Sequence, residues 1–431
     1  MRVAHFSDLH ITDDNRRPWR LDDQAATLAA MVDDIVATAP DLVLLGGDLY
    51  GREVPHPART KERAVLFPEL VRLADVAPVI VIQGNHDLAA EIEELAHLGG
   101  RWPIHVVTGA KVLSIHTAAG TAHVYALAYP SKRGVLAAEL SEGGALGAQR
   151  MVEEALTGLL GAWGHRVRSR RASHPDDVHV GLMHVQVGGC VTSGGEVLDG
   201  QEVQLSRSTL DDIGLDYVAL GHLHKRQEVA SRAWYCGSTW RNDHSEVDPK
   251  GWHLVEVDPR NDACVPWEVE PDRPLPDYTS YRMEDDGRAA ALVSRYPTAC
   301  RTFCTLDYTW TETGWSTRPT REQVEAAAGA EVRMRLTVSE QHVAGCPWAA
   351  EVEAVTASAW RVVEERTIVP VHRVRAPEVS AAVSDREKLE AYWSTLADPP
   401  TDADKAAALA AMADLDALDD ESIARGLRAI G

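Results

Sequence analysis

The sequence predicts an α/β protein: a two-layer β-sandwich flanked by helices, followed by a smaller α+β domain and a C-terminal helix pair. Short, apolar, β-rich runs recur up to about residue 258, and amphipathic helical patterns lie between several of them. A proline-rich stretch then separates this region from a shorter one that has its own helix and strand patterns. A length of 431 residues, 45% of them hydrophobic and 25% charged, is enough for two or three domains.

Eight runs are predicted to be strands, because each is short and apolar and ends abruptly in a polar cluster. They span residues 3–7, 42–47, 79–83, 124–129, 178–183, 217–220, 234–236 and 252–257. Leu28, Val32 and Ile35 lie on one face of a predicted helix before the second run, and a similar apolar face lies between residues 151 and 160. In open α/β sheets the chemistry gathers at the carboxyl ends of strands, which is where this sequence places its polar clusters.

A linker is predicted at about 258–275, where Asp, Asn and several prolines replace the apolar runs. We therefore expect a first domain over residues 1–258, a smaller domain over 275–375 and a helical element over 384–431.

The smaller domain is predicted to contain two helices and two β-rich runs. Thr320 and Gln323 have the spacing of a capping box at the start of the first helix. The predicted strands span 331–338 and 360–374, with the second helix between them.

The C-terminal element is predicted to form two short amphipathic helices. Their narrow apolar stripes are Leu389, Trp393 and Leu396 in the first, and Leu409, Met412 and Leu415 in the second, which Thr401 caps. Segments this short cannot form their own core, so each stripe is expected to pack against another surface. That surface is either a partner or another part of this chain.

Composition and charge exclude several classes of protein. No run of eighteen apolar residues occurs and Met1 leads directly into a strand-like segment, so we expect a soluble, cytoplasmic protein. The six cysteines form no CxxC pair and are expected to be reduced, buried side chains. With 43 basic and 65 acidic residues, the net charge of −22 opposes binding of a polyanion, unless bound cations or local basic patches reverse the field.

Two arginine clusters could form such patches, although both could equally be solvated faces. They are Arg16, Arg17 and Arg20 near the N-terminus, and Arg166, Arg168, Arg170 and Arg171 further along.

Five polar clusters close the predicted strands, and together they have the composition of a metal site. They are Asp8 with His10, Asp48, Asn85 with His86 and Asp87, His184, and His222 with His224. Side chains two positions apart on a strand point to the same side, so a DxH or HxH pair can bind one ion. Carboxylates, imidazoles and a carboxamide suit Mn²⁺, Mg²⁺, Fe²⁺ or Zn²⁺, whereas the lack of thiolates disfavours a structural zinc site.

Seven of these residues are candidate metal ligands: Asp8, His10, Asp48, Asn85, His184, His222 and His224. Seven are too many for one ion with an open position, and they fit two ions that share a bridging carboxylate. Taken singly, each motif more often forms a turn, or contains a histidine whose hydrogen-bonding groups have ordinary protein or water partners. Five such motifs on five strand ends favour the metal site, and the glycines beside them fit backbone that approaches an ion closely.

The motif order D-x-H, GD, GNH(D), H, GHxH resembles that of the calcineurin-like metallophosphoesterases, over roughly the first 258 residues. The resemblance implies one metal on Asp8, His10, Asp48 and His224 and a second on Asp48, Asn85, His184 and His222, with Asp48 as the bridge. It makes Asp48 and His86 the catalytic residues, because His86 would meet the scissile phosphate and protonate the leaving oxygen. Two cations would polarise the phosphate and activate a shared water for in-line attack.

Finer features are similar to the SbcD-type DNA repair nucleases, including Tyr235 to Ser238 and the pair Lys250-Gly251. This resemblance implies a 3′–5′ double-strand exonuclease and single-strand endonuclease that uses Mn²⁺. The smaller domain would be a DNA-capping domain, and the terminal helices would dock onto an SbcC-like, SMC-family ATPase. The family also implies a homodimer through the nuclease domain.

One position departs from the family pattern. Gly51 stands three residues after Asp48, where that family usually has a histidine or aspartate that orients the nucleotide. His56 could replace it, and the balance of exonuclease and endonuclease activity depends on this point. A stand-alone phosphodiesterase or phosphatase on nucleotides or small phosphate esters is the alternative enzyme, and a catalytically silent scaffold is the alternative outside catalysis.

Overall fold

The protein is described by a computed structural model that covers most of the chain. The described residues are 1–14, 17–51, 59–130, 144–196, 203–230, 232–257, 281–282, 291–370, 384–396 and 399–416. Arg16, His56 and the predicted linker at 258–275 lie outside these ranges. The chain forms two compact units, Met1–Tyr308 with Arg318–Arg335 and Pro347–Glu365, and Thr309–Thr317 with Leu336–Cys346 and Arg366–Gly431.

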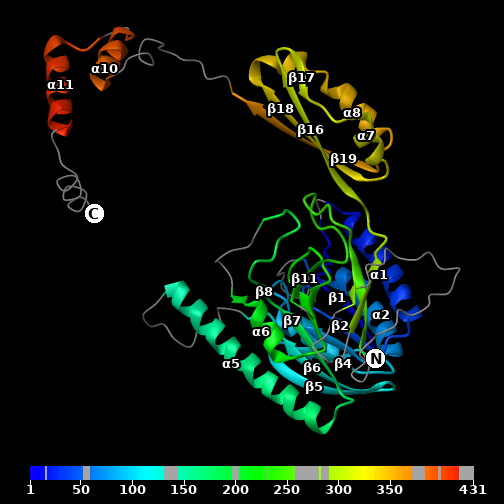
Figure 1. Cartoon of the computed structure of the whole chain (residues 1–431). Coiled ribbons are helices and arrows are strands. Elements are labelled where there is room, and N and C mark those ends of the chain that lie inside the picture. Colours follow the sequence, from blue (N-terminus) through cyan, green and yellow to red (C-terminus); the bar gives the residue numbers. More distant parts are fainter. Residues whose placement is uncertain are drawn as a thin grey trace. The chain divides into compact units, whose positions relative to one another are not determined.

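A seven-stranded mixed sheet forms one layer of the first unit (Figure 1). Its strands, in spatial order, are β14 (Tyr281–Arg282), β15 (Ala291–Pro297), β13 (Gly251–Val257), β1 (Arg2–Phe6), β2 (Leu42–Leu45), β3 (Val79–Ile82) and β4 (Ile104–Val107). Strands β1 to β4 run parallel, and β13 pairs antiparallel with both β1 and β15. The sheet therefore extends past residue 258, and it includes β14 and β15, which the sequence analysis assigned to the smaller domain.

A six-stranded sheet forms the second layer. Its strands, in spatial order, are β11 (Gln227–Ala230), β12 (Ala233–Tyr235), β10 (Tyr217–Gly221), β7 (Val178–His184), β6 (Gly120–Leu127) and β5 (Ala110–Thr117). The four central strands are parallel, and the two edge strands pair antiparallel with their neighbours. A separate two-stranded sheet is formed by the parallel strands β8 (Gln186–Val187) and β9 (Gln204–Leu205).

The two sheets pack face to face through alternate side chains of their strands. Leu42 and Leu44 of β2 point into the shared core with Val180 and Leu182 of β7, and all four are fully buried. The intervening Val43 and Leu45 point to the opposite face of the first sheet. A strand buried on both faces shows no polar alternation, which explains the continuous apolar runs in the sequence.

Helices cover the outer faces of both sheets. The first sheet is covered by α1 (Arg20–Ala37) and α2 (Thr60–Val76), and the second by α5 (Gly144–Ser173) and α6 (Arg207–Ile213). The short α3 (Ala89–Glu93) and η1 (Glu94–His97) follow β3. The predicted two-layer sandwich flanked by helices is thus confirmed.

A smaller four-stranded sheet has the order β17 (Gly314–Thr317), β16 (Phe303–Thr311), β18 (Glu331–Ser339) and β19 (Arg361–Val369). Its helices are α7 (Arg321–Ala326), η2 (Glu340–Gly345) and α8 (Trp348–Thr356). Thr320 and Gln323 form the predicted capping box at the start of α7. Strands β18 and β19 were predicted from the sequence, whereas the β16–β17 hairpin was not, and residues 371–374 of the predicted run 360–374 lie outside the described residues.

The C-terminal helix pair consists of α10 (Asp385–Ser394) and α11 (Asp402–Asp416). Ser384 and Glu387 form a capping box at the start of α10, and Trp393 is its buried residue. Within the described ranges no helix is long and apolar enough to cross a membrane. Of the five described cysteines, all free thiols, Cys190 and Cys236 are buried, whereas the other three are partly exposed, contrary to the prediction.

Candidate metal centre

The predicted site residues lie at the carboxyl ends of strands from both sheets. In chain order these are Asp8 and His10 after β1, Asp48 after β2, Asn85 and His86 after β3, His184 at the end of β7, and His222 and His224 after β10. The structure brings all eight residues together. For example, the backbone N–H of His222 donates to the carboxylate of Asp8, which is 214 positions away in the chain. The centre therefore exists only where the two sheets face each other.

Asp48 lies between two groups of these side chains. Its Oδ2 is 3.6 Å from Nε2 of His10 on one side and 3.6 Å from Nε2 of His184 on the other. Its Oδ1 accepts a hydrogen bond of 2.9 Å from the backbone N–H of His86. A carboxylate that bridged two ions would need this central position.

The first group contains Asp8, His10 and His224, whose ligating atoms lie within 4.8 Å of one another. Nε2 of His10 and Nε2 of His224 are only 2.9 Å apart, so two nitrogens point at the same small space. His86 also lies close to this group, because a ligating atom of His86 is within 4.8 Å of those of His10 and Asp48.

The second group is arranged around Asn85. Its Oδ1 lies 3.0 Å from Nε2 of His184 and 3.0 Å from Nδ1 of His222. Nδ1 of His184 is 2.6 Å from the carbonyl oxygen of Gly46, to which it donates, so Nε2 of His184 carries the lone pair. With Asp48 between them, the two groups contain the side chains of the two predicted ligand sets, and their role as ligands stays a prediction.

Burial makes this cluster electrostatically costly without a cation. Burial raises the pKa of Asp8 and, aided by the neighbouring carboxylates Asp87 and Asp8, raises the pKa of Asp48 well above its usual value. Burial also lowers the pKa of His10 and His184 well below the usual value, which keeps both imidazoles neutral. Buried carboxylates and neutral imidazoles with converging lone pairs are the donor set that a divalent cation satisfies.

The backbone at the centre is held in a rarely populated conformation. Among the described residues five non-glycine residues have positive φ, and four of them are predicted ligands: Asp8 (56°), His10 (44°), Asp48 (53°) and His222 (108°). Such conformations cost of order 1–3 kcal/mol each, and they persist where function requires a side chain to be aimed at a set point.

Two glycines allow close approaches that a side chain would block. A Cβ on Gly84 would lie 2.0 Å from Oδ1 of Asp48, and a Cβ on Gly221 would lie 2.1 Å from the carbonyl oxygen of Gly46. Neither glycine has positive φ. Close packing, rather than turn conformation, therefore requires glycine at both positions.

Asp87 is a buried residue beside the centre for which no role was predicted from the sequence. Its buried carboxylate accepts hydrogen bonds from the backbone N–H groups of Leu49 (2.9 Å), Tyr50 (3.2 Å) and Gly84 (3.0 Å). It therefore joins the loop that carries Asp48 to the loop that carries Asn85. An aspartate at the end of the GNHD motif was the signal available in the sequence.

One arginine of each cluster is placed where it cannot make the predicted phosphate contact. Arg20 is buried and donates to Oδ1 of Asn242, so it does not face solvent. Arg171 pairs with Asp216 at the start of β10, whereas His222 follows the end of that strand, roughly 20 Å away at 3.3 Å per residue. Arg171 thus lies at the edge opposite the metal centre.

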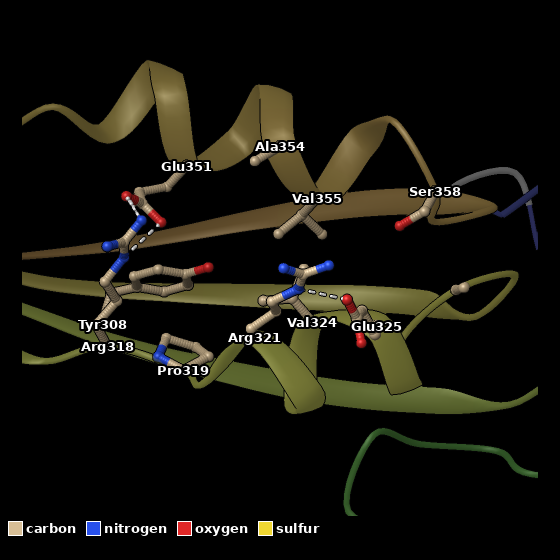
Figure 2. Close-up of a pocket in the computed structure, with 11 residues that line it drawn as sticks. Tyr308, Arg318, Pro319, Arg321, Val324, Glu325, Glu351, Ala354, Val355 and Ser358 are labelled. Carbon is tan, nitrogen blue, oxygen red and sulfur yellow. Dashed lines mark hydrogen bonds and ion pairs between the residues drawn. The ribbon is translucent and has the colours of Figure 1, made fainter.

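A cavity of about 530 Å³ lies beside the smaller sheet, and it is lined by other residues than the metal centre. It lies between α7 and α8, and Figure 2 shows the ion pair of Arg318 with Glu351 and that of Arg321 with Glu325 on its rim. Tyr308 and Val355 contribute to its wall, and its lining contains no predicted ligand.

The family described as calcineurin-like phosphoesterase matches residues 1–226. The SbcD component of the SbcCD nuclease of Staphylococcus saprophyticus is 24% identical over 275 residues, which cover 60% of this chain and 66% of that protein. The DNA double-strand break repair protein Mre11 of Archaeoglobus fulgidus is 32% identical over 99 residues, covering 23% of this chain and 22% of that protein.

A third relative, the uncharacterized metallophosphoesterase YhaO of Bacillus subtilis, is 28% identical over 239 residues, covering 54% of this chain and 49% of that protein. The matches thus span between about a fifth and two thirds of the relatives' lengths. Because the family match covers more than half of the chain, the protein belongs to the calcineurin-like phosphoesterase family. The predicted resemblance to this family and the predicted fold are therefore confirmed.

Proposed function

We propose that this chain is the nuclease component of an SbcCD-like DNA repair complex, which hydrolyses phosphodiester bonds of DNA with two divalent metal ions. The observation that carries the proposal is the position of Asp48, whose Oδ2 lies 3.6 Å from an imidazole nitrogen of each ligand group. The similarity to proteins named as the SbcD component of the SbcCD nuclease and as Mre11 supports DNA as the substrate.

Each residue of the centre has a proposed role. Asp8, His10, Asp48 and His224 would hold the first ion, and Asp48, Asn85, His184 and His222 the second. When bound, the two ions supply the positive charge that neutralises the phosphate and increases the acidity of water. His86 is fixed by the bond from its backbone N–H to Asp48, and its ring centroid lies 5.0 Å from that of His10. From there its imidazole would donate a proton to the leaving oxygen.

The remaining parts of the chain have roles that follow from the same family. The division into residues 1–258, 275–375 and 384–431 is kept as a functional one: a nuclease domain, a capping domain that contacts DNA, and a helix pair that docks onto an SbcC-like ATPase. We further propose Mn²⁺ as the ion, 3′–5′ digestion, a homodimer through the nuclease domain, and a cytoplasmic location.

A stand-alone phosphodiesterase on nucleotides or small phosphate esters is the second candidate. Gly51 favours it, since no side chain stands there to orient a nucleotide, and a Cβ at this position would lie 3.1 Å from the carbonyl oxygen of His10. The similarity to a metallophosphoesterase of no stated substrate is compatible with it.

Three substrates compared side by side test the proposal. The full-length protein with Mn²⁺ is incubated with linear duplex DNA, single-stranded DNA and a chromogenic phosphodiester, with Asp48→Asn as the inactive control. We expect the wild-type chain to digest DNA and Asp48→Asn to be inactive on all three substrates. Turnover of the small diester without any DNA cleavage, alone or with the ATPase, would instead support the second candidate.

A further inference from the structure

We propose that Glu246, held in place by Lys250, is the positioning residue that aims His224 at the first metal ion. This inference rests on the proposed two-metal function. It gives a role to Glu246 and Lys250, which lie in the segment after β12 and outside all of the ligand motifs.

The first step is the hydrogen bond that fixes the imidazole of His224. Nδ1 of His224 lies 2.7 Å from Oε1 of Glu246, and a carboxylate can only accept, so Nδ1 carries the hydrogen. In the neutral imidazole that a metal ion binds, Nε2 of His224 is then left with its lone pair, and this nitrogen lies 2.9 Å from Nε2 of His10. Glu246 therefore selects the tautomer that can bind a metal, and a carboxylate partner also makes the imidazole a stronger ligand.

The second step is the support of Glu246 itself, which is only 5% exposed. Its other oxygen, Oε2, lies 2.6 Å from Nζ of Lys250 and 3.2 Å from Oγ of Ser238. The side chain of Lys250 is fully buried, and its Nζ also lies 3.2 Å from Oδ2 of Asp248. Each oxygen of Glu246 thus has a separate task, one toward His224 and one toward the lysine.

Lys250 also acts on His224 directly. Its Nζ donates a hydrogen bond of 3.0 Å to the backbone carbonyl oxygen of His224. One buried ammonium group therefore holds both the backbone of the ligand and the carboxylate that orients its ring. Burying an ammonium group is costly unless several partners satisfy it, so this arrangement is a built network rather than a chance surface pair.

The third step is the contrast with the second ligand group. His184 is oriented by a backbone carbonyl, that of Gly46 at 2.6 Å, which no substitution of a side chain removes. His224 instead depends on a side-chain carboxylate. Loss of Glu246 should therefore weaken the first metal site and leave the second nearly unchanged.

Metal binding measures this effect without relying on turnover. Co²⁺ is titrated into the full-length protein, with calorimetry for affinity and stoichiometry and visible absorption for the ligand field of the bound ions. We expect Glu246→Ala to weaken one of the two equivalents by roughly 10- to 100-fold, the range found for partners of metal-binding histidines. Glu246→Gln keeps an oxygen that can accept from Nδ1, so it should recover part of this loss, and Lys250→Met should weaken the same equivalent.

Asp216→Asn is the matched control. Asp216 is a buried carboxylate at the start of β10, paired with Arg171 at 2.8 Å, so its loss also removes a buried ion pair but at the far end of the strand. This variant should melt at a lower temperature and still bind two equivalents with wild-type affinity.

Two results would overturn the inference. One is that Glu246→Ala binds both equivalents of Co²⁺ with wild-type affinity. The other is that Glu246→Gln and Asp216→Asn each weaken the binding of both equivalents to the same extent, which would indicate a purely structural role. If Glu246→Ala fails to fold, the isosteric Glu246→Gln decides. A wild-type chain that binds two equivalents but cleaves no phosphodiester would refute the proposed function, and the binding data would still test Glu246.

Discussion

Replacing Gly84 with alanine tests whether Asp48 must occupy its observed position. The added Cβ would lie 2.0 Å from Oδ1 of Asp48 and 2.3 Å from its backbone nitrogen. Ordinary contact with a Cβ begins at 3.4 Å, so the two groups must separate by about 1.4 Å. Because Gly84 does not have positive φ, alanine strains no dihedral angle there, and the whole effect arises from this contact.

The size of the effect follows from that displacement. A shift of about 1 Å in a reacting group can reduce turnover roughly 100-fold, which corresponds to about 2.7 kcal/mol of transition-state stabilisation. Asp48 lies between both ligand groups, so its movement should weaken binding of both ions together. We therefore expect Gly84→Ala to lose at least about 100-fold in turnover and to bind fewer than two metal equivalents.

The assay combines metal analysis of the purified protein with hydrolysis of a chromogenic phosphodiester. Gly161→Ala is the matched control, because a Cβ at this position in α5 meets nothing within 4 Å, and alanine should stabilise the helix slightly. Two full equivalents of metal and wild-type turnover in Gly84→Ala would refute the assignment of Asp48 as the shared ligand.

Three further predictions concern the proton donor, the core and the helix pair. His86→Ala should bind both ions yet lose roughly 10²- to 10⁴-fold in turnover, and loss of metal instead would show that His86 is a ligand. Burial lowers the pKa of His5 to about 3, so the folded state binds a proton less readily than the unfolded chain and loses stability as the pH falls below about 6.5. From pH 8 to pH 5 the free energy of unfolding should fall by about 2 kcal/mol because of His5 alone. In denaturant titrations His5→Gln should remove this part of the fall, whereas His116→Gln, a control at an exposed position, should not. Truncation before Ser384 should spare cleavage of small diesters but abolish pull-down of the ATPase; a large loss of melting temperature with binding retained would contradict the docking role.

The candidate metal ligands could be predicted from the sequence because their signal is local. DxH, GD, GNH and GHxH each follow an apolar run, and the carboxyl end of a buried strand is where a short polar motif can face a shared edge. The clusters that flank β1, β2, β3, β7 and β10 in the structure are those that the sequence analysis marked. Buried strands and capped helices were also predictable, since length, apolar content and capping residues are properties of a few neighbouring positions.

Strand pairing was decided by tertiary structure alone. Strand β15 pairs with β13 across more than thirty intervening residues, and nothing in either run states which sheet it will join. The edge strand β5 escaped notice because most of its side chains are exposed or half-buried, so it lacks the apolar run that marks a buried strand. The boundary near residue 258 was predicted from a change of composition along the chain. Strands on either side of such a boundary can still pair, because hydrogen bonds join strands that are neighbours in space.

By itself the sequence determined the family, the two-sheet α/β class and the residue types that can hold metal, because these depend on short motifs and periodicity. Only the tertiary structure decided how those motifs meet. Asp48 lies close to both His10 and His184 because the two sheets pack face to face. Glu246 contacts His224 and is itself paired with the buried Lys250. The physical reason is that such contacts join residues far apart in the chain, where packing and charge compensation, rather than local propensity, select the partner.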